Sequence, residues 1–367
     1  MTEWWTTSRL ATSFRFRVDI LRTGVRATDI FNVAGSETVS VSVELSLCTS
    51  DSDIVRSLLT GEVEPDGIEL TSLTEYPPRR HRRFFRHGEF DVCEVSLASY
   101  LSSRANREQY PFTAIPVFPS KRFRHSFFYK HTDAGIDGPA DLEGKDVGVQ
   151  SWQTTANVWV RGIAAEHYGL DLESVTWYRR KEDDVPIDVP DRFDVREIGD
   201  DAVSDPAGMR EMLFDGDLDA AMDPAGSLFH AVRESDSVEL MFDDPIAEEQ
   251  AYYEKTEIHP PMHVVAIRDE VLEANPWVAV NVYDAFCEAR DDAIDRNSSP
   301  STHMTMTWGH IHLSNQREVL GEDLWEYGLT EKTRRELRTF VDYAHDQGLI
   351  PRKYAVDELF VDETVDL

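Results

Sequence analysis

The chain has 367 residues, of which 41% are apolar, so it is long enough for two lobes built around a hydrophobic core. Its 69 acidic residues outnumber 37 basic residues and give a net charge of −32, a field that repels nucleic acid and anionic membrane surfaces. Only 7 of the basic residues are Lys, which indicates adaptation to a high-salt cytoplasm or, alternatively, simply an acidic bacterial protein.

The cysteines and the N-terminal segment indicate a reduced, intracellular setting. Cys48, Cys93 and Cys287 include no CxxC pair, so neither a disulfide framework nor a thiolate zinc site is expected. No run of 18 apolar residues occurs, so no membrane span is expected. Residues 1–40 contain five Arg and four acidic residues but no apolar signal region. We expect this segment to be a weakly ordered extension, with a basic targeting arm as the alternative, and the protein to be cytoplasmic.

Short strands alternate with helices from Val41 onwards. In the first part of the chain we expect strands at 41–47, 67–70, 91–95 and 112–117, and helices at 54–59, 79–87 and 96–107. A second α/β unit follows, with strands at 147–149, 175–178 and 218–222, helices at 154–168 and 209–214, and an acidic surface excursion at 179–205. The chain then returns through a strand at 263–267 to helices at 276–294, 315–320 and 331–346.

This order predicts an α/β protein with parallel sheets, helices on both faces, and two lobes joined by two crossovers. We expect lobe 1 to comprise residues 41–126 and 264–367, including helices near the C-terminus, and lobe 2 to comprise residues 127–263. Ligands of such folds bind between the lobes, at the carboxyl ends of the strands.

A helix start in the second unit is the first candidate for an anion site. The strand at 147–149 leads through a polar turn to Thr154 or Thr155, either of which is a good N-cap, and Gly169 suits the left-handed end of the helix. Free N–H groups and the helix dipole favour a negative charge there. Ser96 and Ser99 are expected to play the same part on lobe 1.

Two arginines in a stretch that we expect to be extended, residues 122–130, point to a carboxylated ligand. In such a stretch Arg122, Arg124 and Ser126 would share one side and His125 the other. Arg suits this task because its planar guanidinium pairs with a carboxylate through two hydrogen bonds. Arg124 is the first choice and Arg122 its rival, with a surface ion pair as the alternative for each.

Five motifs resemble those of 4,5-dihydroxyphthalate decarboxylases and their relatives. They are FDVCEVSLASYL (90–101), IPVFPSKRFRHS (115–126), DLEGKDVGVQSWQTTANVWVRG (141–162), WEYGL (325–329) and YAHDQGLIPRKYAVDELF (343–360). The resemblance implies a two-lobed type 2 periplasmic-binding-protein-like fold with a ligand cleft between the lobes and a helical C-terminal tail. Trp152 and the long acidic stretch 179–203 depart from the expected pattern at the second lobe's side of the cleft, where Trp152 is expected to contact the substrate.

The reaction that the resemblance implies needs bound carboxylates, a phenol that accepts electron density, and a proton for the ring carbon that loses CO2. The phenol itself is the electron sink, so neither an organic cofactor nor a metal is required. His125 is a candidate proton donor, or else a packed core residue. Glu94 is either a cleft acid or a charge at a helix start, and His263 is a candidate cleft residue at the return crossover.

Two further residues complete the expected site, and a metal site is not expected. Arg161 follows Thr154 by seven residues on one helix face, about 10 Å along the axis, so its contact with a ligand would be marginal. Asp223 precedes Pro224 at a helix start and is expected to cap that helix or to face the ligand. His259 and His263 have metal-pair spacing, but Pro260 and Pro261 exclude the helix that would bring them together, so no metal site is expected.

We therefore expect cofactor-independent decarboxylation of a hydroxylated aromatic dicarboxylate, similar to 4,5-dihydroxyphthalate, to a dihydroxybenzoate and CO2. The alternative is a non-catalytic solute-binding protein of the ABC-transporter type for a small organic acid. The expected partner is a small aromatic or organic acid rather than nucleic acid or membrane, and formation of a homo-oligomer stays open.

Overall fold

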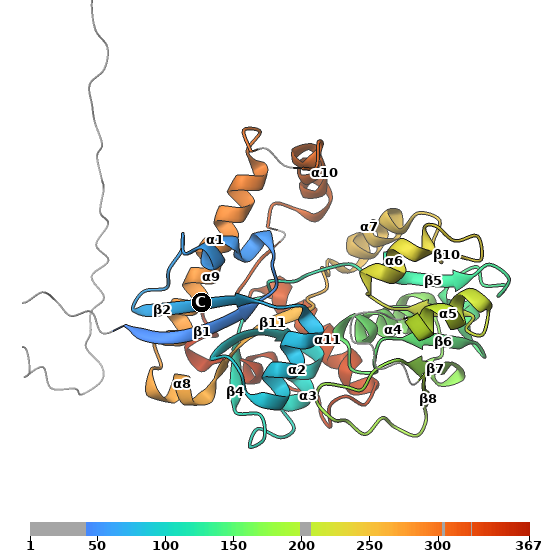
Figure 1. Ribbon diagram of the computed structural model, residues 1–367, viewed down its shortest axis with the longest axis horizontal. Helices are drawn as coiled ribbons and strands as arrows, with labels where there is room; N and C mark the ends of the chain where they lie inside the picture. Colours follow the sequence, from blue (N-terminus) through green and yellow to red (C-terminus); the bar gives the residue numbers. More distant parts are fainter. Residues whose placement is uncertain (1–41, 199–206, 303–304, 324) are drawn as a thin grey trace, which may run out of the picture. The chain divides into compact units, whose positions relative to one another are not determined.

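The computed structural model describes residues 42–198, 207–302, 305–323 and 325–367. The extension expected at 1–40 lies outside the described residues, as do residues 199–206 of the expected acidic excursion. Within residues 42–367 the strands form two sheets, and Figure 1 shows helices packed around both. Among the described residues, none of the helices has the length and apolar character needed to cross a membrane.

The first sheet has the strand order β2–β1–β3–β11–β4. These strands are β1 (Val43–Thr49), β2 (Ile68–Thr74), β3 (Val92–Ser96), β4 (Phe112–Ile115) and β11 (His263–Arg268). Every residue of the central strand β3 is buried, as expected for a strand covered on both faces. The accompanying helices are η1 (Asp53–Val55), α1 (Arg56–Thr60), α2 (Pro77–His87), α3 (Leu97–Ser103), α8 (Asp269–Ala274) and α9 (Val278–Ser298).

The second sheet has the strand order β10–β5–β9–β6–β7–β8. These strands are β5 (Phe128–His131), β6 (Asp146–Val149), β7 (Thr176–Arg179), β8 (Asp194–Glu197), β9 (Ala220–Met222) and β10 (Val238–Leu240). The accompanying helices are η2 (His125–Phe127), η3 (Pro139–Leu142), α4 (Thr155–Tyr168), η4 (Leu172–Ser174), α5 (Ala207–Asp215), α6 (Gly226–Val232) and α7 (Pro245–Thr256). Strand β8 lies inside the stretch that was expected to be an irregular excursion, so that expectation was wrong there.

The expectation of parallel sheets was only partly right, because both sheets are mixed. Strand β1 is parallel to β2 and β3, and β6 is parallel to β7 and β9, but β11 runs antiparallel to β3 and β4. Likewise β5 is antiparallel to β9 and β10. Strand β11 runs antiparallel because of the path of the chain. The chain returns from the second sheet beside the end of β3, so His263 pairs with Ser96.

The two crossovers between the sheets are joined to each other by backbone hydrogen bonds. The Arg122 N–H donates to the Pro260 carbonyl at 2.9 Å, and the Met262 N–H donates to the Ser120 carbonyl at 2.7 Å. After this short bridge the chain turns into η2 rather than staying extended, so the prediction of one extended face over 122–130 was wrong.

The C-terminal part is helical, as expected, and connects the two halves of the fold. It contains α10 (Gly309–Leu320), α11 (Glu331–Asp346), η5 (Val356–Leu359) and η6 (Asp362–Thr364). Helix α11 packs against both α3 and α4, and one continuous hydrophobic core includes side chains from both sheets and from α11.

Helix α4 begins and ends where its sequence predicts. It follows strand β6 and a polar turn, Thr154 occupies the N-cap position, and Gly169 ends the helix with a left-handed φ of 77°. The Thr154 side chain makes no capping hydrogen bond, because its hydroxyl pairs with that of Ser151 at 2.8 Å. The free N–H groups of the first helical turn are therefore not satisfied by the threonine side chain.

Candidate functional site

A cavity of about 460 Å³ lies where the carboxyl ends of strands from both sheets meet the crossovers. This is the position predicted for a ligand cleft. Its lining comes from segments far apart in the sequence: Ser50–Asp53, Tyr76–Pro78, His81, Ser96, Ser99, Pro119–Arg122, Arg124, Gln150, Ser151, Gln153–Ala156, Lys181, Asp184, Pro224, Ala225, Met262, His263 and Trp325.

Arg122 and Arg124 both line this cavity, although they do not share a strand face. Among the described residues neither guanidinium forms an ion pair with a carboxylate, and Arg124 is only 8% exposed. The Arg124 Nε contacts the Met262 sulfur at 3.2 Å, and its guanidinium lies over the Phe127 ring. Burial, and next the charge of Arg122, lower the pKa of Arg124 to about 9. These two arginines give one end of the cavity a positive charge.

His263 lines the cavity and is anchored from behind by Glu94. Its Nδ1 lies 2.5 Å from the Glu94 carboxylate, which is 1% exposed. The same carboxylate accepts hydrogen bonds from the Ser50 N–H and hydroxyl and forms an ion pair with Arg80 at 3.0 Å. Glu94 is thus neither a residue of the cavity wall nor a helix-start charge but the buried partner of His263.

The charges in this network are fixed by burial and pairing. Burial alone would raise the pKa of Glu94, but Arg80, His263 and the Ser50 N–H together hold it well below its usual range. Burial lowers the pKa of His263, and Glu94 opposes that effect. At neutral pH, Glu94 is therefore a carboxylate and His263 a neutral imidazole that donates from Nδ1. Its Nε2 then carries the lone pair.

His81 is a cavity residue that sequence reasoning missed. It lies on α2, is buried, and its ring meets the His263 ring edge-on with centroids 5.0 Å apart. The segment 79–87 was expected to be a basic helix, and none of its residues was assigned to the site. A signal was present, however: Phe84 and Phe85 mark the buried face of the helix, and Arg80 and His81 precede them by one helical turn.

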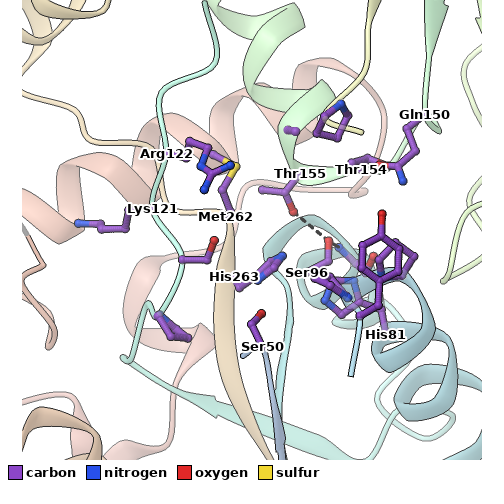
Figure 2. Close-up of a pocket in the computed structure, with 18 of the residues that line it drawn as sticks. Ser50, His81, Ser96, Lys121, Arg122, Gln150, Thr154, Thr155, Met262 and His263 are labelled. Atoms are coloured by element: carbon purple, nitrogen blue, oxygen red, sulfur yellow. Dashed lines mark hydrogen bonds between the residues drawn. The ribbon is translucent and has the colours of Figure 1, made fainter. Parts of the chain in front are cut away.

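Hydroxyl groups from the end of β3 and from the start of α4 meet in the cavity wall. The Ser96 and Thr155 hydroxyls are 2.8 Å apart, and Thr155 Oγ1 also accepts from the Ala98 N–H (Figure 2). Ser96 caps α3 by accepting from the Ser99 N–H at 3.4 Å. Ser99 and Thr154 also line the cavity, so all four residues lie around one cavity, although Thr155 and Ser96 are already paired with each other.

Lys121 and Lys181 also line the cavity, and both have acidic partners. The Lys121 ammonium pairs with buried Glu336 of α11 at 2.7 Å, and Lys181 pairs with Asp184 at 3.5 Å. Because these charges are already compensated, they offer less to an anionic ligand than the two arginines do. Figure 2 shows Lys121 and Arg122 on one side of His263 and His81 on the other.

His125 does not line the cavity, which corrects its expected role in proton transfer. It is 1% exposed within a cluster of aromatic rings from Phe128, Tyr168, Phe242 and Tyr252. Neither ring nitrogen has a hydrogen-bond partner among the described residues, and burial lowers its pKa to about 4. The turn η2 rotates this side chain into the core, so the alternative of a packed core histidine describes it.

Trp152 and Arg161 lie behind the cavity wall rather than in it. The Arg161 guanidinium stacks on the Trp152 ring at 3.8 Å and donates to the Trp152 carbonyl and to Gln347. The Trp152 indole N–H donates to the Gln347 carbonyl at 3.0 Å. Both side chains are buried, so they connect the turn before α4 to the C-terminal part of the chain instead of contacting a ligand.

Asp223 is likewise a structural residue. Its carboxylate is fully buried, pairs with Arg180 at 2.7 Å and accepts from the Ala225 N–H at 2.8 Å. Helix α6 has Ala225 at its N-cap position and no side-chain capping hydrogen bond, so Asp223 does not cap the helix as expected, and it does not line the cavity either. Among the described residues, no group of three or more His, Cys, Asp or Glu side chains is arranged to hold a metal ion.

Comparisons with solved structures support the fold. The periplasmic aliphatic sulphonate binding protein of Escherichia coli matches with a TM-score of 0.51 at 13% identity, over 88% of this chain and 99% of that one. A protein of Archaeoglobus fulgidus matches with a TM-score of 0.50 at 14% identity, over 84% of this chain and 98% of that one. The chain therefore has the periplasmic-binding-protein fold that its motifs imply.

Comparisons of sequence go further, although no family model matches the chain. A 4,5-dihydroxyphthalate decarboxylase of Comamonas testosteroni is 34% identical over 326 residues, covering 87% of this chain and 96% of that protein. A second one, from Pseudomonas putida, is 42% identical over 137 residues, covering 37% of this chain and 53% of that protein. The chain belongs to the 4,5-dihydroxyphthalate decarboxylase family.

Proposed function

We propose that this protein decarboxylates 4,5-dihydroxyphthalate, or a closely related hydroxylated phthalate, to a dihydroxybenzoate and CO2. The observation that supports this most is one cavity with two arginines free of carboxylate partners and a histidine held by a buried carboxylate. Family membership supports the same reaction. The alternative of a non-catalytic solute-binding protein is not favoured, because the curated relatives are decarboxylases by name.

The shape of the substrate suggests its orientation. The two carboxylates of a phthalate are ortho to each other and share one end of the ring, while the hydroxyls lie at the opposite end. Arg122 and Arg124 provide the cationic end of the cavity, so we place both carboxylates there. The ring then extends past Met262 towards His263 and His81.

His263 is the proposed proton donor to the ring carbon. The resting imidazole is neutral, but a bound dicarboxylate adds negative charge beside it and favours the imidazolium. Glu94 stabilises that imidazolium through Nδ1, leaving the Nε2–H to point at the ring. Proton transfer to the ring carbon, together with loss of the phenol proton to a base, turns the phenol into a dienone. The C–CO2 bond then breaks, its electron pair restores the aromatic ring, and CO2 leaves.

The proposal also covers the cellular compartment of the protein and its division into two lobes. Cys48 and Cys93 are paired positions on neighbouring strands and both are free thiols, which suits a reducing cytoplasm. We propose lobes close to those expected from the sequence, residues 41–126 with 264–367 and residues 127–263, but with His263 assigned to the first lobe, because β11 begins at this residue.

The test is CO2 release from 4,5-dihydroxyphthalate by the wild-type protein and by His263→Gln. We expect turnover by the wild type and a fall in kcat of about 10²–10⁴-fold in the variant, the usual contribution of a positioned acid. His310→Gln, at an exposed position on α10, is the control and should behave as the wild type. Unaltered turnover by His263→Gln would remove this residue from the chemistry, and tight binding without CO2 would contradict the proposed reaction.

A further inference from the structure

The cavity contains a second imidazole that the proposed proton donor does not explain. His81 is 6% exposed, lines the cavity, and meets the His263 ring at an interplanar angle of 87°. Its Nε2 is buried without a hydrogen-bond partner among the described residues. A buried polar group without a hydrogen bond raises the free energy of the resting protein. A hydrogen bond from a ligand group would remove that cost.

We infer that His81 is a second catalytic residue of this site, the base that accepts the proton of the ring hydroxyl para to the departing carboxylate. The inference rests on the proposed decarboxylation. It also defines the substrate class: phthalates with a hydroxyl para to a carboxylate are turned over, and phthalates without one are bound but not turned over.

The order of groups along the cavity supports this assignment. Arg124 is close enough to His263 to affect its charge electrostatically, and His263 is in ring contact with His81. Along the cavity, the Arg124 cation is therefore followed by the His263 imidazole and then by the His81 imidazole. A ring whose carboxylates meet the arginines and whose reacting carbon meets His263 directs its far end, with the para hydroxyl, towards His81.

The surroundings of His81 keep its imidazole unprotonated in the resting protein. Arg80 is committed to Glu94, and Lys181 is paired with Asp184. Burial, then the charges of His263, Arg80 and Lys181, hold the pKa of His81 well below its usual range. The imidazole is therefore neutral at physiological pH, with one nitrogen lone pair available to a phenol proton.

The two imidazoles together balance the reaction. The phenol O–H bond breaks and its proton bonds to His81, while the O–H electron pair becomes the carbonyl π bond. The displaced ring electrons form the new C–H bond with the proton from His263. When CO2 leaves, the electron pair of the broken bond rearomatises the ring, and the phenolate oxygen recovers its proton from His81. His263 regains a proton from solvent, so one proton is consumed for each CO2.

His81→Gln is the first test, because Gln keeps a polar side chain without a basic nitrogen. We expect kcat for 4,5-dihydroxyphthalate to fall by about 10²-fold or more, and the Kd of phthalate to stay within about threefold of wild type. His87→Gln, at an exposed position on the same helix, is the matched control and should leave both values unchanged. A lower kcat with an unchanged Kd indicates a chemical role for His81, whereas a raised Kd indicates a structural one.

His81→Ala with added imidazole is the second test. Free imidazole should restore part of the lost kcat, with a rate that rises with the concentration of its unprotonated form. A kcat for His81→Gln within about threefold of wild type would overturn the inference, and so would the absence of rescue. Loss of phthalate binding in both variants would make His81 a structural residue and overturn it too. A wild-type protein that releases no CO2 would instead overturn the proposed function itself, and this inference with it.

Discussion

Arg122 and Arg124 line the cavity, and neither pairs with a carboxylate among the described residues, although the chain has 69 acidic side chains. Arg124 is also buried, and a buried cation without a partner destabilises the resting protein. An anionic ligand removes that penalty on binding. The cavity is thus complementary to a carboxylate despite a net charge of −32 on the whole chain.

Arg124→Ala should weaken binding of phthalate. Loss of a charge-assisted hydrogen bond of about 1.5–3 kcal/mol corresponds to a Kd about 10- to 150-fold higher. Titration calorimetry with phthalate measures this, and Arg338→Ala, an exposed arginine on α11, is the control. An unchanged Kd in Arg124→Ala would exclude this residue from the anion site.

His125 should contribute to the pH dependence of stability rather than to catalysis. Its pKa falls from about 6.5 in the unfolded chain to about 4 in the fold, so its share of stability is complete above pH 6.5 and is lost as pH falls towards 4. At about pH 5 that loss is about 2 kcal/mol.

The variant His125→Phe tests this. Phe suits the aromatic cluster and has no nitrogen to leave unpaired, so it should be at least as stable as wild type at about pH 7.5 and should lose less stability at about pH 5. Urea unfolding at the two pH values measures the difference. Equal losses in both proteins would show that His125 does not titrate in this range.

The sequence predicted residues well where a local pattern determined their direction and poorly where tertiary packing did. Arg124 was found because it stands in a dense motif beside a crossover. His125 was placed in the site because a strand was assumed, whereas η2 turns its ring into the core. Arg161 has the right spacing from Thr154, but it stacks on Trp152, which no pattern in the sequence indicates.

Helices α4 and α11 approach each other closely at Gly162, and this contact holds the site's helix against the C-terminal part of the chain. A Cβ at position 162 would lie 2.1 Å from the Tyr343 ring. That ring cannot easily move, because it packs edge-on against Trp159 and its hydroxyl donates to Glu166. Glycine is therefore required by packing and not by the backbone conformation.

Gly162→Ala should destabilise the protein by about 1–2 kcal/mol, because an overpacking cost near the upper end of about 1–3 kcal/mol outweighs the gain of about 1 kcal/mol in helix propensity. Gly138→Ala is the matched control, since a Cβ at position 138 would meet no atom within 4 Å. The free energy of unfolding in urea measures both changes. Equal stability of the two variants would contradict the close α4–α11 contact.

The alternation of strands and helices in the sequence was sufficient to predict the type and order of most elements, but not the pairing of strands. Strand β11 runs antiparallel because it returns from the second sheet, which is a property of the chain's path and not of its local composition. Strand β8 was missed because its four residues, Asp194–Glu197, include three charged side chains and no apolar run.

The net charge of −32 acts on the whole molecule. Like charges repel within the compact state, and they also repel a dianionic substrate as it approaches. Raising NaCl from about 0.1 M to about 2 M should therefore raise the Tm and lower the KM for 4,5-dihydroxyphthalate, because the Debye length shortens. Thermal unfolding and steady-state kinetics across this range measure both effects. A Tm that falls with salt would contradict adaptation of the chain to high salt.

The two-lobed architecture and the position of the cavity followed from the motifs, since long ordered segments specify a family more firmly than single residues specify a role. The histidine pair did not follow from them. His81 and His263 are 182 positions apart in the sequence and meet only because α2 and β11 converge on the end of β3. Such a pair is visible only once the fold is known.

The proposed decarboxylation is best tested by NMR of the product formed from 4,5-dihydroxyphthalate by the wild-type protein in D2O. We expect 3,4-dihydroxybenzoate with deuterium on the ring carbon that lost its carboxylate, together with one CO2 for each product molecule. Recovery of unchanged substrate from a protein that binds it tightly would contradict the account and leave this chain a binding protein.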